Sequence, residues 1–223
     1  DYAHEDLVPY VLAKKGDDLR IDWGYLYVNP DGGNATPVAK IALREFASAN
    51  FIKTGSLGGN EGLPATEKAD RFVAAVSFDL LKVSAKRTSC WLTLAYDDLY
   101  SIQYMNKNLR PYWRRNGWEA ADLLKAAAKD YEPLVKRCAA FDEELMADLT
   151  RAGGEKYAKL CALAYRQCFA AGKIVADDNG QPLQFPKENH SNGCIGTSDV
   201  FYPMSPQFLL FGPSLAKSFL VPF

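Results

Sequence analysis

The sequence predicts an α+β protein in which a β-rich region, residues 1–115, precedes a helical region, residues 116–223. Aromatic and β-branched runs between turn residues indicate strands in the first region, and an apolar period of 3.6 residues indicates helices in the second. The composition, 48% apolar and 24% charged, is ordinary for a folded protein. We therefore expect an antiparallel, β-sandwich-like N-terminal part followed by α-hairpins.

Charge and hydropathy exclude two classes of partner. The 26 Lys and Arg residues against 27 Asp and Glu residues give a net charge of −1, whereas nucleic-acid binding usually needs a concentrated basic surface. No run of about 18 apolar residues is present, so we expect no membrane partner. The five cysteines lack a CxxC pair and there are only two histidines, so we expect no metal and no other cofactor.

Strand and turn signals alternate over the first hundred residues. An aromatic run over residues 22–28 predicts a strand that stops at the turn cluster of residues 29–34. Residues 71–83 and 90–96 predict two further strands. Residues 37–50 could instead form a short helix.

The helical region is predicted from one apolar stripe and its end signals. Pro133 suits a first-turn position, so the long helix is expected to begin there, after a shorter helix over residues 119–129. Gly153 and Gly154 end the long helix, and a second amphipathic helix follows up to Gly172, which predicts an αα-hairpin. Residues 178–180 predict a tight turn. The stripe consists of Leu134, Cys138, Phe141, Leu145 and Leu149.

Residues 186–206 follow neither period and are predicted to form a polar loop that carries the site. Glu188 and Asp199 are the candidate catalytic pair, because hydrolysis of an amide or a glycoside needs one carboxylate to activate water and one acid to protonate the leaving atom. Lys187 would keep one of them ionised. The alternative is that these groups only hold the loop to the helices by hydrogen bonds.

Polar residues around this pair are the candidate substrate-binding groups. They are Lys187, Asn189 and Asn192 in the loop, together with Asp97 and Asp98 at the end of a predicted strand. Adjacent carboxylates in an extended chain point in different directions, so Asp97 and Asp98 are not expected to act as a dyad. One of them could instead cap a turn while the other reaches a cleft or a domain contact.

Several stretches resemble the large glutaminase A family. The longest is residues 187–200, Lys-Glu-Asn-His-Ser-Asn-Gly-Cys-Ile-Gly-Thr-Ser-Asp-Val, followed by Tyr202 and Pro203. Residues 96–104, residues 22–25 and residues 163–167 carry the rest of the resemblance, which runs in order over nearly the whole chain.

The resemblance implies a secreted or periplasmic hydrolase that converts L-glutamine to glutamate and ammonia. It also implies a β-sandwich region followed by a six-hairpin α/α toroid, an architecture shared with many glycoside hydrolases. Only about four helices fit after residue 115, so we expect a piece of a longer polypeptide with an incomplete (α/α)6 toroid. Its partners would be a small-molecule substrate, the remainder of the same polypeptide, or a second copy bound through uncovered apolar faces.

Two other functions stay open. The toroid and the many aromatic residues also suit a glycoside hydrolase acting on a saccharide. A noncatalytic carbohydrate-binding or structural module is the alternative outside the enzymes.

Overall fold

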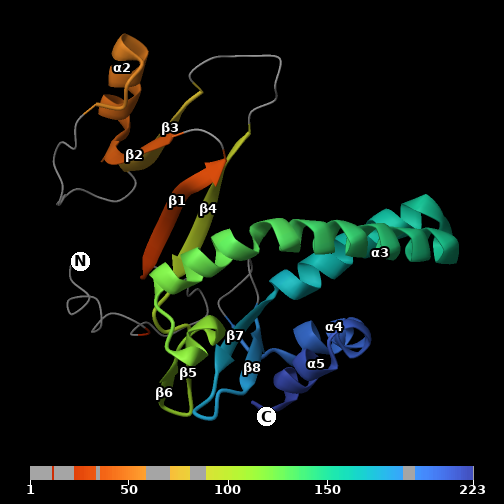
Figure 1. The fold of residues 1–223 in the computed structure, drawn as a ribbon. Coiled ribbons are helices and arrows are strands. Elements are labelled where there is room, and N and C mark those ends of the chain that lie inside the picture. The colour runs from red at the N-terminus through yellow and green to blue at the C-terminus, as the bar shows by residue number, and fades with distance from the viewer. Residues whose placement is uncertain are drawn as a thin grey trace. The chain divides into compact units, whose positions relative to one another are not determined.

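The chain forms two units, each of which mixes helices with antiparallel strands (Figure 1). The larger unit comprises Asp1–Tyr25 and Tyr96–Phe223, and the smaller one Leu26–Ala95. The predicted α/β mixture is confirmed, whereas the sandwich, the toroid and the division at residue 115 stay predictions. The computed structural model describes residues 23–33, 36–58, 71–80, 89–187 and 194–222, together with Leu12.

In the smaller unit, the described residues form two strand pairs and one helix. β1 (Tyr25–Gly33) pairs with β4 (Cys90–Asp97). β2 (Thr36–Leu43) lies antiparallel to β3 (Phe72–Asp79), in a register that sets Thr36 opposite Asp79 and Leu43 opposite Phe72. The strand predicted over residues 90–96 is confirmed as β4, and the strand predicted over residues 71–83 is confirmed as β3 up to Asp79, while residues 81–83 lie outside the described residues.

One local prediction in this unit is wrong, and one alternative holds only in part. β1 continues through residues 29–33, because pairing with β4 prevails over the turn-forming composition of this segment. The alternative of a helix over residues 37–50 holds for the second half only: the first half belongs to β2, and the helix α2 (Arg44–Thr54) begins after it. The apolar residues of β2 are stabilised by pairing with β3, a long-range contact that local sequence does not reveal.

Two β-hairpins form the sheet part of the larger unit. β5 (Ile102–Tyr104) and β6 (Lys107–Leu109) are joined by Met105 and Asn106, whose φ angles of 48° and 62° fit a type I′ turn. β7 (Gly172–Ala176) and β8 (Pro182–Pro186) are joined through the predicted turn at residues 178–180. The hairpins enclose a core of Ile102, Leu109, Val175, Leu183 and Phe185.

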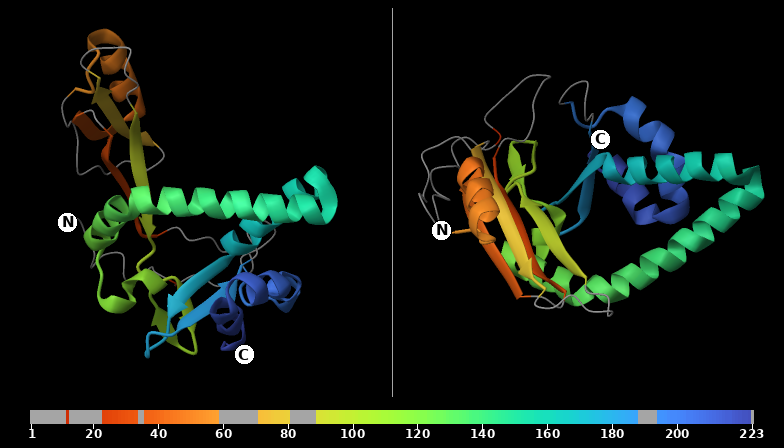
Figure 2. Two further views of the ribbon diagram at one scale, coloured as in Figure 1. Left: turned by 45° about the vertical axis from the view of Figure 1, so that its right-hand side comes forward. Right: turned by 90° about the horizontal axis from the view of Figure 1, so that it is seen from above.

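Between the hairpins the chain makes a short 3-10 helix, η3 (Tyr112–Asn116), and the long α3 (Ala120–Ala170). Gly154, with φ 80° and ψ 175°, is not helical and divides α3 into two arms. The arms diverge from this turn (Figure 2). The predicted αα-hairpin is therefore confirmed. Glycine suits this turn, because a residue without a Cβ reaches positive φ at little cost.

Pro133 does not begin a helix, as was predicted, but lies inside the first arm. Its ring fixes φ at a helical value, and it removes only the one hydrogen bond that its own N–H would have made. The helical turns on both sides continue. The separate short helix predicted over residues 119–129 is therefore the beginning of this arm.

The predicted polar loop of residues 186–206 is partly helical, because α4 (Ser198–Phe211) begins at Ser198. Pro203 and Pro206 lie inside this helix and made it hard to predict. Pro206 has no N–H for the carbonyl group of Tyr202, and the Ser205 hydroxyl donates to that oxygen instead, at 2.8 Å. Apolar packing on the inner face of α4 stabilises the remaining turns.

An aromatic ladder connects both arms of α3 with α4 and α5 (Pro213–Leu220). Successive ring centroids lie 4.7–5.5 Å apart, which is contact distance for aromatic pairs. α5 is also held to β8, where the Ser218 hydroxyl donates to the buried Gln184 side chain at 3.4 Å. The ladder runs through Phe141, Tyr165, Phe169, Phe208 and Phe219.

Replacing the central ring of the ladder should destabilise the fold. Phe208 has no exposed surface, so Phe208→Ala should lower the free energy of unfolding by about 3–5 kcal/mol through lost burial and a cavity. Leu210→Ala on the same helix is the control, because Leu210 is 73% exposed and should change stability by less than about 1 kcal/mol. Denaturant unfolding followed by circular dichroism measures both; equal losses would contradict this packing.

Candidate functional site

Two of the candidate substrate-binding residues, Asp97 and Asp98, lie where β4 ends: Asp97 is its last residue and Asp98 begins the turn that follows. Asp97 is 1% exposed and Asp98 is 0% exposed. Asp97 Oδ1 accepts a hydrogen bond from the Leu99 N–H at 3.0 Å, and Leu99 has a positive φ of 58°. Such a backbone is unusual for a residue with a Cβ, and it persists only where its surroundings fix it.

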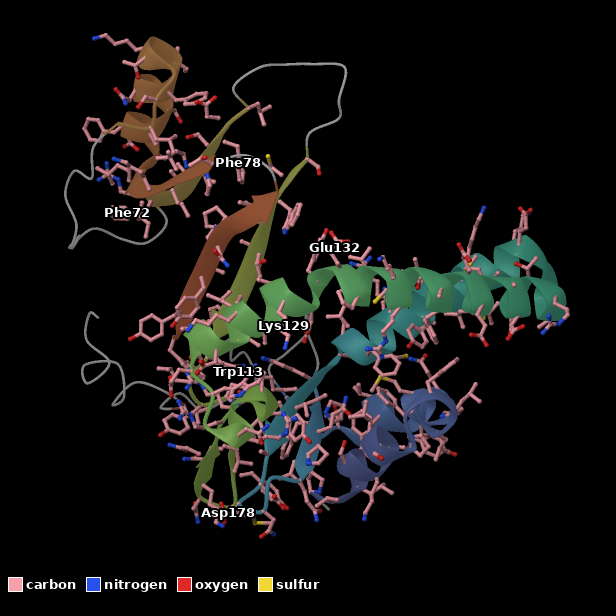
Figure 3. The ribbon with its side chains drawn as sticks, in the orientation of Figure 1. Phe72, Phe78, Trp113, Lys129, Glu132 and Asp178 are labelled. Carbon is pink, nitrogen blue, oxygen red and sulfur yellow. The ribbon has the colours of Figure 1, made fainter. Side chains whose placement is uncertain are left out.

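Arg114 of η3 is the cation that compensates Asp97. Its Nε donates to Asp97 Oδ1 at 3.3 Å and its Nη2 donates to Asp97 Oδ2, a bidentate arrangement. Nη1 donates to the Glu119 carboxylate at 2.6 Å, at the beginning of α3. The guanidinium lies 4.6 Å from the centre of the Trp113 ring, which Figure 3 labels.

Burial and pairing act in opposite directions on Arg114. Burial favours the neutral form, but the hydrogen bonds that the guanidinium donates to Asp97 and Glu119 outweigh it and raise the pKa of Arg114 above its ordinary value. The guanidinium therefore keeps its charge at all physiological pH values.

Asp98 points to a different cation, as expected for adjacent residues of an extended segment. Its Oδ1 accepts from the Ser101 hydroxyl at 2.8 Å, and Lys173 Nζ of β7 lies 2.5 Å from its Oδ2. The Lys173 side chain is 30% exposed, so its ammonium group connects a fully buried carboxylate with the surface.

Trp23 and Gly24 contact this turn directly. Trp23 Nε1 donates to the carbonyl oxygens of Asp98 and Tyr100, at 2.7 and 3.2 Å. A Cβ on Gly24, which has φ 105°, would overlap the Asp97 carbonyl oxygen. The glycine is therefore required by a close approach of two backbones. Two of the stretches that carry the family resemblance thus meet at one place.

Lys187 lies at the end of β8, where the second candidate region begins. Its N–H donates to the Ala171 carbonyl at 2.8 Å, and Lys187 is bridged to Ile195 in antiparallel pairing. The Gly196 N–H donates to the Pro186 carbonyl at 2.9 Å. The residues that precede and follow positions 188–193 are therefore fixed to each other at the end of β8. Glu188, Asn189 and Asn192 lie outside the described residues, as does His190.

Asp199 lies in the first turn of α4 and is exposed. Thr197 is the N-cap residue, and the Val200 N–H donates to its carbonyl at 3.1 Å. A first-turn position suits a carboxylate, because the free N–H groups of a helix N-terminus point toward it. The helix, rather than the predicted loop, therefore determines the place of Asp199.

The register of the β7–β8 hairpin relates Lys173 to Lys187. Lys173 lies opposite Phe185, and residues two apart on a strand share a face, so Lys173 and Lys187 lie on the same face. Asp98 joins this group through Lys173, whereas Asp97 is turned toward Arg114.

Sequence reasoning missed Arg114 and Lys173. A signal existed, because two carboxylates next to a buried apolar turn require compensating cations. The described residues hold no group of three or more His, Cys, Asp or Glu side chains suited to a metal ion. Among the helices of the same residues, none combines the length and hydropathy needed to cross a membrane.

Removing the cation of the buried pair should strongly destabilise the protein. Arg114→Met leaves Asp97 charged and buried, which should lower the free energy of unfolding by about 3–5 kcal/mol. The double variant Asp97→Leu/Arg114→Met removes both charges and should lose less than the single variant. The neighbouring Arg115 is exposed, and Arg115→Met should cost about 1 kcal/mol or less. Equal losses for Arg114→Met and Arg115→Met in urea unfolding would contradict the account.

Comparisons with known proteins relate this architecture to a family. Residues 6–148 match the family described as "Domain of unknown function (DUF5127)", and residues 154–223 match the "Glutaminase A six helical-hairpin domain". The second match begins at Gly154, the turn between the two arms of α3. No solved structure gave a significant match.

Two curated proteins are similar to the chain. Glutaminase A of Aspergillus oryzae is 31% identical over 179 residues, which cover 77% of this chain and 26% of that protein. A protein named "Probable glutaminase" from Arthroderma benhamiae is 24% identical over 238 aligned residues, covering 98% of this chain and 27% of that protein. The chain thus spans about a quarter of the length of these relatives. Since the family models and both relatives agree with the resemblance seen in the sequence, the chain belongs to the glutaminase A family.

Proposed function

We propose that this chain is part of a hydrolase that cleaves the side-chain amide of L-glutamine to glutamate and ammonia. The observation that carries the proposal is the 31% identity to a protein named Glutaminase A, over 77% of the chain. The match of residues 154–223 to a glutaminase A helical domain supports it independently of that one relative.

The reaction needs two proton transfers. A general base takes a proton from water as its oxygen attacks the amide carbon, and a general acid gives a proton to the nitrogen that leaves as ammonia. We assign these roles to Glu188 and Asp199, without deciding which is the base. Asp199 is exposed in the first turn of α4, where water reaches it.

Chain connectivity supports the assignment. Glu188 directly follows Lys187, and Lys187 is bridged to Ile195, four residues before Asp199. The hydrogen bond from the Gly196 N–H to the Pro186 carbonyl connects the same two parts of the chain. The two candidate carboxylates are therefore attached to the two sides of one fixed strand end, although they are eleven positions apart in sequence.

Lys187, Asn189 and Asn192 are proposed as groups that bind the polar ends of the substrate. An ammonium group and amides supply the donors that a carboxylate and an amide oxygen require. The ion pairs of Asp97 and Asp98 favour a positioning role for these residues, since each carboxylate is buried and already bound to a cation. Asp98 would act through Lys173, which shares a hairpin face with Lys187.

Amide variants of the candidate pair test the chemistry. In the full-length protein, Glu188→Gln and Asp199→Asn should each lower kcat for ammonia release from L-glutamine by about 100-fold or more, because each removes one proton transfer. The temperature of thermal unfolding should change little. Glu143→Gln, on an exposed position of α3, is the matched control and should keep full activity.

Two outcomes would contradict the proposal at different points. Unchanged turnover of either variant would remove that residue from catalysis. A wild-type protein that releases sugar from oligosaccharides but no ammonia from glutamine would overturn the substrate while leaving an acid–base pair possible.

A further inference from the structure

The ion pairs of the two adjacent carboxylates differ in how far their cations are buried. Asp97 and Arg114 are both buried, with side chains 2% and 3% exposed, and the guanidinium donates to both carboxylate oxygens. The side chain of Asp98 is 0% exposed, but that of its partner Lys173 is 30% exposed. The first pair is therefore closed, whereas the second is accessible from its cationic side.

The ammonium group of Lys173 has donors that Asp98 does not use. Asp98 Oδ1 accepts from the Ser101 hydroxyl at 2.8 Å, and Lys173 Nζ lies 2.5 Å from Oδ2. Oδ2 receives no aligned hydrogen bond, so this contact is mainly one of charge. An ammonium group carries three N–H donors, and Asp98 is its only partner among the described residues. At least two donors can therefore bind a further acceptor.

The residue type fits such a second contact. A guanidinium is a planar fork that matches both oxygens of one carboxylate, as Arg114 does with Asp97. An ammonium is a compact charge whose donors can reach several acceptors at once. Asp98 holds this charge at a fixed place before a ligand arrives, which lowers the entropy that binding costs. Lys173 is thus a prepared site for an anionic group.

Lys173 lies beside the strand end to which the candidate catalytic residues are attached. It is opposite Phe185, and Lys187 follows two residues later on the same face of the hairpin. Residues in such a diagonal relation lie about 7–8 Å apart, a distance that the carbon chain of one amino acid can bridge. Glu188 is the next residue in sequence. A substrate held at Lys173 by one end can therefore extend toward this strand end.

We propose that Lys173 binds the α-carboxylate of the amino-acid substrate and that Asp98 is the positioning residue that holds the Lys173 ammonium group. The inference rests on the glutamine hydrolysis proposed above, and it adds the group by which the substrate is recognised. L-Glutamine carries a carboxylate at one end and a neutral amide at the other. Binding of the carboxylate at Lys173 directs the amide away from this lysine, toward the candidate catalytic pair. The protein should then prefer free glutamine to glutamine with a blocked α-carboxylate.

A comparison of two substrates in the full-length protein tests this recognition. The second substrate is L-glutamine α-methylamide, which has no carboxylate and releases ammonia only from its side chain. The wild type should show a kcat/KM about 10–100-fold higher for L-glutamine, because the neutral analogue loses a charge-assisted hydrogen bond. In Lys173→Met this ratio should fall to about threefold or less. Ammonia release at several substrate concentrations measures both values.

Two further variants separate recognition from stability. Lys173→Met leaves Asp98 charged and buried, which destabilises the protein, but the ratio for two substrates on one preparation does not depend on the folded fraction. Asp98→Asn/Lys173→Met removes both charges and should lose the preference equally. Lys107→Met is the matched control, because Lys107 pairs with Asp178, labelled in Figure 3, and both are exposed. It should keep the wild-type ratio.

The positioning role of Asp98 has its own readout. Asp98→Asn keeps the shape of the side chain but removes the charge that holds Lys173. It should raise KM for L-glutamine several-fold while kcat stays within about threefold, since the bond that breaks lies at the other end of the substrate. A fall in kcat at unchanged KM would overturn this role.

The outcomes distinguish this proposal from the proposed reaction. If the wild type hydrolyses L-glutamine but Lys173→Met keeps the full preference for it, Lys173 does not bind the carboxylate and the reaction still stands. Equal hydrolysis of both substrates by the wild type, or an equal loss of preference in Lys107→Met, would overturn the proposal in the same way. A wild type that releases no ammonia from L-glutamine would overturn both.

Discussion

The structure of the larger unit depends on the compensation of one buried carboxylate. β4 ends by carrying Asp97 into the interior, and a single charge there would be very unfavourable. The guanidinium of Arg114 is the only common side chain whose geometry satisfies both carboxylate oxygens at once. The same guanidinium binds Glu119, so the end of β4, the short helix η3 and the beginning of α3 are held at one point.

The β7–β8 hairpin is the second fixed part of the larger unit. One face packs on the β5–β6 hairpin through Val175, Leu183 and Phe185. The other face contacts α5 through the buried Gln184, and a Cβ on Gly172 would lie only 2.5 Å from the Gln184 amide nitrogen. Because both faces are occupied, the open end of the hairpin is fixed, and it carries Lys173 and Lys187. Polar groups at the open end of this hairpin are therefore held in a defined position.

Part of this arrangement could be predicted from the sequence, and the predictions that were wrong have physical reasons. The αα-hairpin was predictable because its apolar stripe and Gly154 act locally. The extension of β1 and the beginning of β2 depend on pairing with distant strands, which local composition does not show. α4 was missed because Ser205 repairs the hydrogen bonding that Pro206 disrupts. Of the candidate site, the different directions of Asp97 and Asp98 were predicted, but their burial and their partners Arg114 and Lys173 were not.

The family and the fixed strand end are what supports the proposal of an amide hydrolase with Glu188 and Asp199 as its carboxylates. The most direct measurement is a crystal structure of the full-length protein with the product glutamate bound. We expect the side-chain carboxyl group of glutamate to lie within hydrogen-bond distance of both Glu188 and Asp199. Glutamate bound elsewhere, with these two carboxylates turned away from it, would contradict the account.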